Sequence, residues 1–138
     1  SNSEIFRPLS GAGYLSGWYG PEPGEQPSSY IVMLTDLSLS QHAPVDIGIQ
    51  AQTILLAATN EGFGGCMIAS VKKAALKTIL NIPENFDISL VLAMGKPKEI
   101  VVTENLRENG DIRYWRDEKQ VHHVPKRLLQ QLVLRIID

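Results

Sequence analysis

The feature that most constrains the fold is a long and nearly uncharged helical pattern from Asp46 to about Glu61. Its apolar residues recur at the spacing of one helix face: Ile47, Ala51, Ile54, Leu55 and Ala58. Asp46 is a good N-cap, because its carboxylate can accept hydrogen bonds from the first turn. A helix with so few charges predicts a position in the middle of the fold rather than on an outer face.

Apolar runs elsewhere predict strands. The run from Ser29 to Asp36 is short and β-branched, and the run from Phe86 to Gly95 is the strongest strand signal, a continuous apolar segment that ends at a glycine. A shorter strand is expected at Ile112 to Asp117. Because strands alternate with helices, the pattern indicates a mixed α/β or α+β layer fold.

Two further helices and one long loop complete the first part of the chain. A short helix is expected over residues 4–15, and a second from Val71 to about Asn81, with Ser70 as its cap. Residues 16–29 are rich in Gly, Pro and Ser, which predicts a long surface loop. A loop of this length is often functional.

The composition is that of an ordinary globular chain. With 138 residues, 43% of them hydrophobic, and a formal net charge of -2, it predicts one domain over residues 1–138 and no nucleic-acid partner. A single cysteine excludes an internal disulfide framework, and a cytoplasmic location is expected. No apolar run is long enough to span a bilayer, so no membrane partner is expected.

The stretch NEGFGGCMIAS, residues 60–70, holds three glycines and the only cysteine. Gly62 stands where a left-handed helix C-cap is favoured. A dinucleotide-binding loop is disfavoured, because its glycines must follow a strand and these follow a helix. Cys66 is predicted to serve packing rather than nucleophilic attack, and CMIAS is predicted to be extended.

No catalytic side chain and no metal site are predicted. His122 and His123 are adjacent on an extended segment, so they point in opposite directions and cannot both bind one metal. One is expected at the surface and the other in a local hydrogen bond. Lys72 and Lys73, in the first turn of a helix, are interpreted as solvated cations, with a nearby anion as the alternative.

Four basic residues near the C-terminus leave two readings open. They are suited to a phosphate group, or they form a polar face at the edge of the domain: Arg113, Arg116, Lys126 and Arg127.

The C-terminal segment KRLLQQLVLRIID is predicted to be helical, with apolar residues on more than one face. A small monomer would bury all of them with difficulty. We therefore expect the tail to pack on a second subunit, while packing across its own core is the alternative.

Three segments in this order resemble the nitroreductase family of flavoenzymes: DIGIQAQTILLAATNEGFGGCMIAS, then LVLAMGKPKE, then DIRYWRDEKQVHHVPKRLLQQLVL. The upstream segment IFRPLSGAGYLSGWYGPEPGEQPSSYIVMLTD also resembles a subgroup of the family. The resemblance implies an α+β, nitroreductase-like fold with a central, mostly antiparallel sheet flanked by helices.

The resemblance also implies a homodimer with FMN at the subunit interface. NAD(P)H would reduce the flavin and leave before a small-molecule acceptor, such as a nitroaromatic or a quinone, takes the electrons in a ping-pong scheme. The alternative is a flavin-deficient, nitroreductase-like binding or assembly module without redox activity. The loop with Trp18 and Tyr19 would cover the flavin or pack on the partner subunit.

The site residues are carried over by position. Ile68, Ala69 and Ser70 match the segment whose backbone approaches the flavin ring edge, where small side chains let amides come close. Lys126 and Arg127 match the C-terminal cationic contact to the FMN phosphate, with Arg116 as a further candidate. The arginine-rich opening of the family does not precede Ser3, so we expect the chain to be N-terminally truncated relative to the family.

Overall fold

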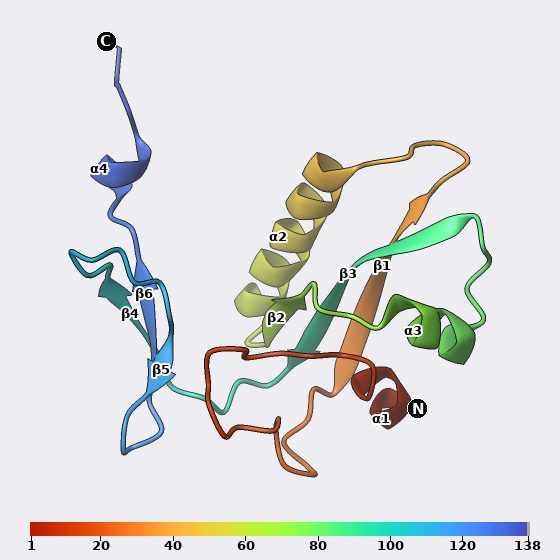
Figure 1. Cartoon of the computed structure of the whole chain (residues 1–138), viewed down its shortest axis with the longest axis horizontal. Helices are drawn as coiled ribbons and strands as arrows, with labels where there is room; N and C mark the ends of the chain where they lie inside the picture. Colours follow the sequence, from red (N-terminus) through yellow and green to blue (C-terminus); the bar gives the residue numbers. More distant parts are fainter. Residues whose placement is uncertain (138) are drawn as a thin grey trace. The chain divides into compact units, whose positions relative to one another are not determined.

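The computed structural model describes residues 1–137, which form two compact units (Figure 1). Unit 1 comprises residues 1–11 and 20–97, and unit 2 comprises residues 12–19 together with the chain from Lys98 onward. Unit 1 contains α1 (Asn2–Phe6), β1 (Ser29–Asp36), α2 (Pro44–Asn60), β2 (Gly64–Ile68), α3 (Lys73–Leu80) and β3 (Phe86–Gly95). Unit 2 contains β4 (Val101–Asn105), β5 (Trp115–Arg116), β6 (His122–Lys126) and α4 (Leu129–Leu132). That these units act as one domain stays a prediction.

The sheet of unit 1 has the strand order β1-β3-β2, and both pairings are antiparallel. Ala93 of β3 lies opposite Tyr30 of β1 on one side and Cys66 of β2 on the other. The bounds of β1 and β3 are those expected from the sequence, and the expected α+β class is confirmed.

β3 is apolar throughout because both of its faces are covered. Leu92 packs with Met33 and Ala51 of α2 on one face, whereas Ile88 and Val91 pack with Leu76 of α3 on the other. Ile88 and Val91 can share a face despite their odd spacing because the register shifts between them, where Met33 pairs with Leu90 and Leu34 with Ile88.

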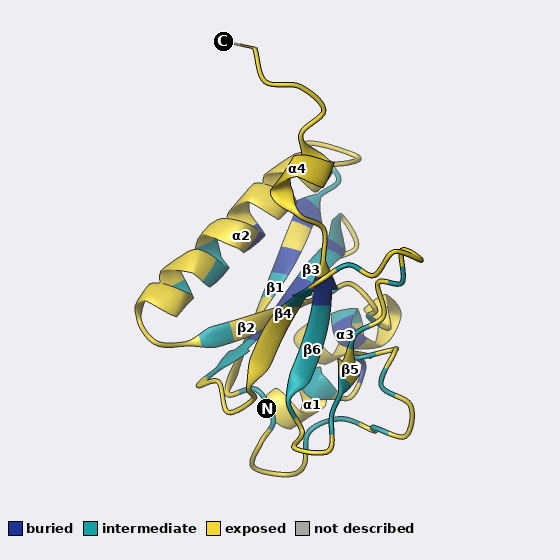
Figure 2. Ribbon diagram, turned by 90° about the vertical axis from the view of Figure 1, so that its left-hand side faces the viewer, coloured by how far each residue is buried: buried dark blue, intermediate teal, exposed yellow. Residues whose placement is uncertain are grey.

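The prediction that α2 lies in the middle of the fold is wrong for the single chain. Only Ala51 is buried, and Figure 2 colours most of the helix as exposed. Val45, Ile49 and Leu56 are 71%, 62% and 61% exposed. A nearly uncharged helix that packs on a single sheet buries only one of its own faces, so the opposite face of α2 remains open.

The ends of α2 follow ordinary capping rules. The helix begins two residues before the predicted cap, with Ala43 at the N-cap and Pro44, whose missing N–H costs nothing there, in the first turn. Asp46 lies in the first turn instead, where its charge suits the helix dipole. At the other end Gly62 has φ +77°, and Phe63 N–H bonds the Ala58 carbonyl at 2.9 Å, which confirms the predicted left-handed cap.

The helices at residues 4–15 and 71–81 are shorter than expected. α1 ends at Phe6, and Leu9 instead forms an isolated bridge with Val71. Ser70 does not cap α3, because its carbonyl accepts a 2.9 Å hydrogen bond from Ser10 and keeps the backbone extended. α3 therefore starts only at Lys73.

Unit 2 is built on a second three-stranded sheet of order β4-β6-β5, with β6 parallel to β4 and antiparallel to β5. Neither β4 nor β6 is among the strands expected from the sequence. The prediction of a helical C-terminal tail is also wrong, because α4 has only four residues and the backbone is already extended at Val133. A helix this short is marginal without tertiary packing. Within residues 1–137, no helix is long and apolar enough to cross a membrane.

Candidate functional site

The end of β2 presents free backbone donors. Ile68 is half-buried and pairs with Val91, whereas Ala69 and Ser70 are exposed. No hydrogen bond within residues 1–137 uses the N–H of Ala69 or of Ser70. Two adjacent amides with small side chains can therefore donate to an oxygen or nitrogen acceptor of a bound molecule.

Gly65 holds β2 close to its neighbours. A Cβ at this position would lie 2.5 Å from Leu55 Cδ2 and 3.1 Å from the Ala93 carbonyl oxygen. The glycine therefore serves the packing of β2 against α2 and β3. Cys66 is exposed on this edge strand, so the prediction that it packs as a buried side chain in the core is wrong. An edge strand has no neighbour to cover its outer side.

Lys126 and Arg127 are exposed cations at the end of β6. Within the part of the chain that the structure describes, neither side chain forms an ion pair with an acidic group. The backbone at Lys126 is fixed, because its carbonyl accepts a 2.9 Å bond from Leu106. Two uncompensated cations on a fixed backbone can bind an anionic group such as a phosphate.

Arg116 has its charge already compensated. Its Nε donates to Glu99 Oε1 at 3.1 Å, and Nη2 donates to the same oxygen. Burial raises the pKa of Glu99, but the hydrogen bonds from Arg116 and the close His122 ring outweigh it and hold that pKa below its usual value. The Arg116 guanidinium also lies over the Trp18 ring, 5.1 Å from its centroid.

The sheet register separates Arg116 from the other two cations. Arg116 pairs with His122, whereas Lys126 lies four residues further along β6, roughly 13 Å away at the usual strand rise. Lys126 and Arg127 thus form one candidate site, and Arg116 belongs to another part of unit 2.

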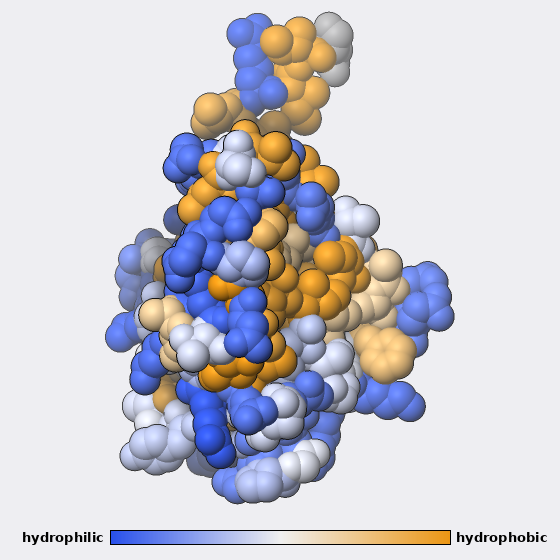
Figure 3. All heavy atoms as spheres, turned by 90° about the vertical axis from the view of Figure 1, so that its right-hand side faces the viewer, coloured by the Kyte–Doolittle hydropathy of each residue, from blue (hydrophilic) through white to orange (hydrophobic). Residues whose placement is uncertain are grey.

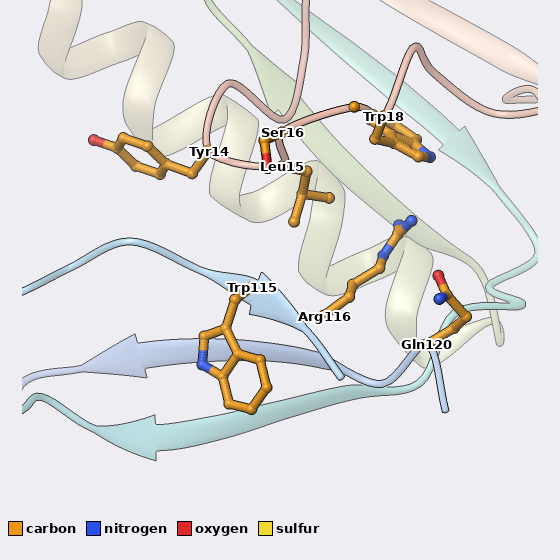
Figure 4. Close-up of a pocket in the computed structure, with 8 residues that line it drawn as sticks. Tyr14, Leu15, Ser16, Trp18, Trp115, Arg116 and Gln120 are labelled. Carbon is orange, nitrogen blue, oxygen red and sulfur yellow. The ribbon is translucent and has the colours of Figure 1, made fainter. Parts of the chain in front are cut away.

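A pocket of about 370 Å³ lies within unit 2. In Figure 4 the Trp18 ring, the Arg116 guanidinium and the Gln120 amide point toward one another, while the rings of Tyr14 and Trp115 point away. Trp18 thus contacts its own chain, whereas Tyr19 is 99% exposed. The sequence did not reveal this pocket, because its two parts are far apart in the chain.

The two histidines of β6 lie on opposite faces, as predicted, but both are half-buried and both meet carboxylates. His122 Nδ1 is 3.1 Å from Glu99 Oε1, although the ring is not aligned for a hydrogen bond, and the ring packs edge-on against Tyr114. His123 Nδ1 is 2.6 Å from Glu104 Oε1. The expectation of one surface histidine is therefore wrong, because β6 is the central strand of its sheet and has a neighbour on each side.

A family model described as "Nitroreductase family" matches residues 25–96, just over half of the chain. The match spans β1 to β3 and contains the segment 67–70. The chain belongs to the nitroreductase family. This confirms the resemblance seen in the sequence and the nitroreductase-like fold class.

Solved nitroreductase structures match part of the chain. One is a nitroreductase family protein from Clostridium novyi NT, at 31% identity and a TM-score of 0.46, covering 50% of this chain and 43% of that one. Another is a nitroreductase family protein (cd3355) from Clostridium difficile 630, at 19% identity and a TM-score of 0.46, covering 51% and 46%. The chain spans less than half the length of these proteins.

The nitroreductase match divides the predicted site residues. Ile68, Ala69 and Ser70 lie inside the matched region, whereas Arg116, Lys126 and Arg127 lie beyond it in unit 2. Within residues 1–137, no group of three or more His, Cys, Asp or Glu side chains could hold a metal ion.

Proposed function

We propose that this nitroreductase family chain is an FMN-dependent oxidoreductase that transfers electrons from NAD(P)H to a small-molecule acceptor such as a nitroaromatic or a quinone, in a ping-pong scheme. The family match over residues 25–96 carries the proposal. FMN, when bound, supplies the redox chemistry that no side chain of this site offers. The protein contributes binding, orientation and charge.

The end of β2 fits the role of holding a flavin ring edge. Ala69 and Ser70 have free N–H donors, and their side chains are too small to keep a flat ring away. Donors directed at ring nitrogen and carbonyl oxygen atoms stabilise negative charge when it develops there. Ile68 anchors the segment through its pairing with β3.

Lys126 and Arg127 fit the role of holding the FMN phosphate. Both are exposed and uncompensated, so no internal ion pair has to be broken before they bind an anion. Arg116 is a weaker candidate, because binding a phosphate would compete with its bonds to Glu99.

Spectroscopy and turnover test the proposed function. The purified chain should be yellow or become so on incubation with FMN, and it should then oxidise NADH or NADPH faster in the presence of a quinone than without one. A chain that stays colourless and leaves the fluorescence of added FMN unchanged would contradict the proposal and favour the binding or assembly module. FMN binding without turnover would contradict the oxidoreductase activity alone.

We also propose a homodimer, supported by apolar surface that the single chain leaves open. One such surface is the outer face of α2. A second is the C-terminal tail, where Leu134, Ile136 and Ile137 are 102%, 79% and 78% exposed. Figure 3 shows hydrophobic residues along this tail. Surface of this kind marks a contact site for another protein.

Light scattering at micromolar concentration should therefore give the mass of two chains. Replacing an exposed apolar residue of α2 with a charge, Ile49→Glu, should shift the mass toward one chain, because burying an unpaired carboxylate is costly. Gln50→Glu, on the exposed neighbouring position, is the matched control and should leave the dimer intact. A monomeric mass for the unmodified chain would rule out the dimer.

A further inference from the structure

His123 lies at the centre of unit 2 and contacts both neighbours of its strand. Glu104 of β4 is 2.6 Å from Nδ1, and Asp117, the residue directly after β5, is 3.4 Å from Nε2. The imidazole also stacks on the Trp115 indole, with ring centroids 4.2 Å apart and planes 9° apart. One side chain therefore connects all three strands of the sheet.

This geometry requires a particular protonation state. A carboxylate only accepts hydrogen bonds, and a neutral imidazole has a single N–H to donate. Both contacts can be hydrogen bonds only when His123 is an imidazolium, and a cation is also attracted to the face of the Trp115 indole. In the neutral ring one nitrogen presents a lone pair to a carboxylate instead.

We propose that His123 is a protonation-dependent clamp, which holds β5 and the turn after it against β6 while the ring is charged and releases them when the ring loses its proton. The neutral ring keeps its N–H on the shorter contact, to Glu104, so the contact to Asp117 is the one that is lost. β5 has only two residues, so its backbone pairing with β6 is short.

The released segment forms one wall of the unit 2 pocket. Trp115, Arg116 and Gln120 line the pocket and lie on β5 or in the turn that follows it. Gln120 has φ +61°, a left-handed conformation that costs free energy in a residue other than glycine. Loss of the clamp therefore loosens a wall that is already strained.

The charges around the ring set the direction of the effect. Burial lowers the pKa of His123, but the hydrogen bonds to Glu104 and Asp117 outweigh it and raise that pKa above the ordinary 6.5. Backbone donation from Val121 is the main cause that lowers the pKa of Asp117, so its carboxylate stays ionised. Glu99 and Arg116 lie with His122 on the other face of β6 and do not face this ring.

The stability supplied by the clamp follows from this shift. Because the pKa is higher in the folded than in the unfolded chain, the contribution is fully present below the ordinary value of 6.5. It is lost as the pH rises through the higher pKa of the folded chain.

Amide hydrogen exchange of the whole chain tests the proposal. The Asp117 amide donates to the Val121 carbonyl at 3.1 Å, and the Val121 amide donates to Asp117 Oδ1 at 2.9 Å. Their protection factors, corrected for the intrinsic pH dependence of exchange, should fall roughly tenfold between about pH 6 and pH 8.5, as expected when a charge-assisted bond is lost. The Leu106 amide, bonded to Lys126 on the opposite side of β6, should keep its protection.

An NMR titration of the His123 ring is the second measurement. Its midpoint should lie above 6.5, and Glu104→Gln should lower it, whereas Asp111→Asn, which removes a carboxylate paired with Arg113, should not. A midpoint at or below 6.5 would overturn the proposal, as would unchanged protection at Asp117 and Val121. Should Glu104→Gln fail to fold, these wild-type measurements decide alone.

Discussion

The double substitution Lys126→Ala and Arg127→Ala should weaken FMN binding by about 100-fold. Each hydrogen bond from a cation to a phosphate contributes at least about 1.5 kcal/mol, and about 1.4 kcal/mol corresponds to a factor of ten in affinity. Both side chains are exposed and lack an ion-pair partner within residues 1–137, so their removal breaks no ion pair among the described residues. Titration of FMN fluorescence against each protein gives the two dissociation constants.

Lys119→Ala is the matched control, because Lys119 is another exposed cation of unit 2, in the turn between β5 and β6. Its removal changes net charge by one but should leave FMN affinity within about twofold, as screening weakens charges that are not in contact with the ligand. Equal affinity of the double variant and the unmodified chain would remove Lys126 and Arg127 from the site.

The substitution Leu76→Ala should lower the free energy of unfolding of unit 1 by about 2–5 kcal/mol. Leu76 is fully buried in α3 and packs with Ile88 and Val91, so truncation leaves a cavity against the central strand. Urea unfolding followed by far-UV ellipticity is the suitable measurement, because the two longest helices, α2 and α3, lie in unit 1.

Leu80→Ala on the same helix separates cavity formation from helix propensity. Leu80 is 36% exposed, so the same chemical change should cost less than about 1 kcal/mol. Tryptophan fluorescence follows the unfolding of unit 2 separately from that of unit 1, because Trp18 and Trp115 both lie in unit 2. Equal unfolding midpoints for the two variants would mean that the α3 face of the sheet is not the packed core described above.

Unit 1 could be predicted from the sequence because its elements depend on local patterns. A continuous apolar run such as that of β3 indicates a strand with both faces covered, and a glycine just after a helix, such as Gly62, favours a left-handed cap. Both features are found in the structure. Ser70 misled the prediction because a serine that can cap a helix can equally remain extended when its carbonyl has another partner.

Unit 2 could not be predicted because its sheet depends on pairs that are distant in sequence. β4 and β6 are short and rich in polar residues, and only their parallel pairing makes them strands. Likewise, no spacing rule indicates that His123 lies between Glu104 and Asp117. Position in the family pattern indicates that Ile68, Ala69 and Ser70 approach the flavin, whereas only the structure shows that the amides of Ala69 and Ser70 are free.

The segment 12–19 belongs to unit 2, although the chain on either side of it belongs to unit 1. Tyr14 packs against Tyr114 at a ring distance of 5.0 Å, and Trp18 packs against Arg116. During synthesis from the N-terminus, these aromatic side chains leave the ribosome long before their partners do. The order of translation therefore lets the sheet of unit 1 form first, with the early segment held as an open loop until the last strands arrive to close it.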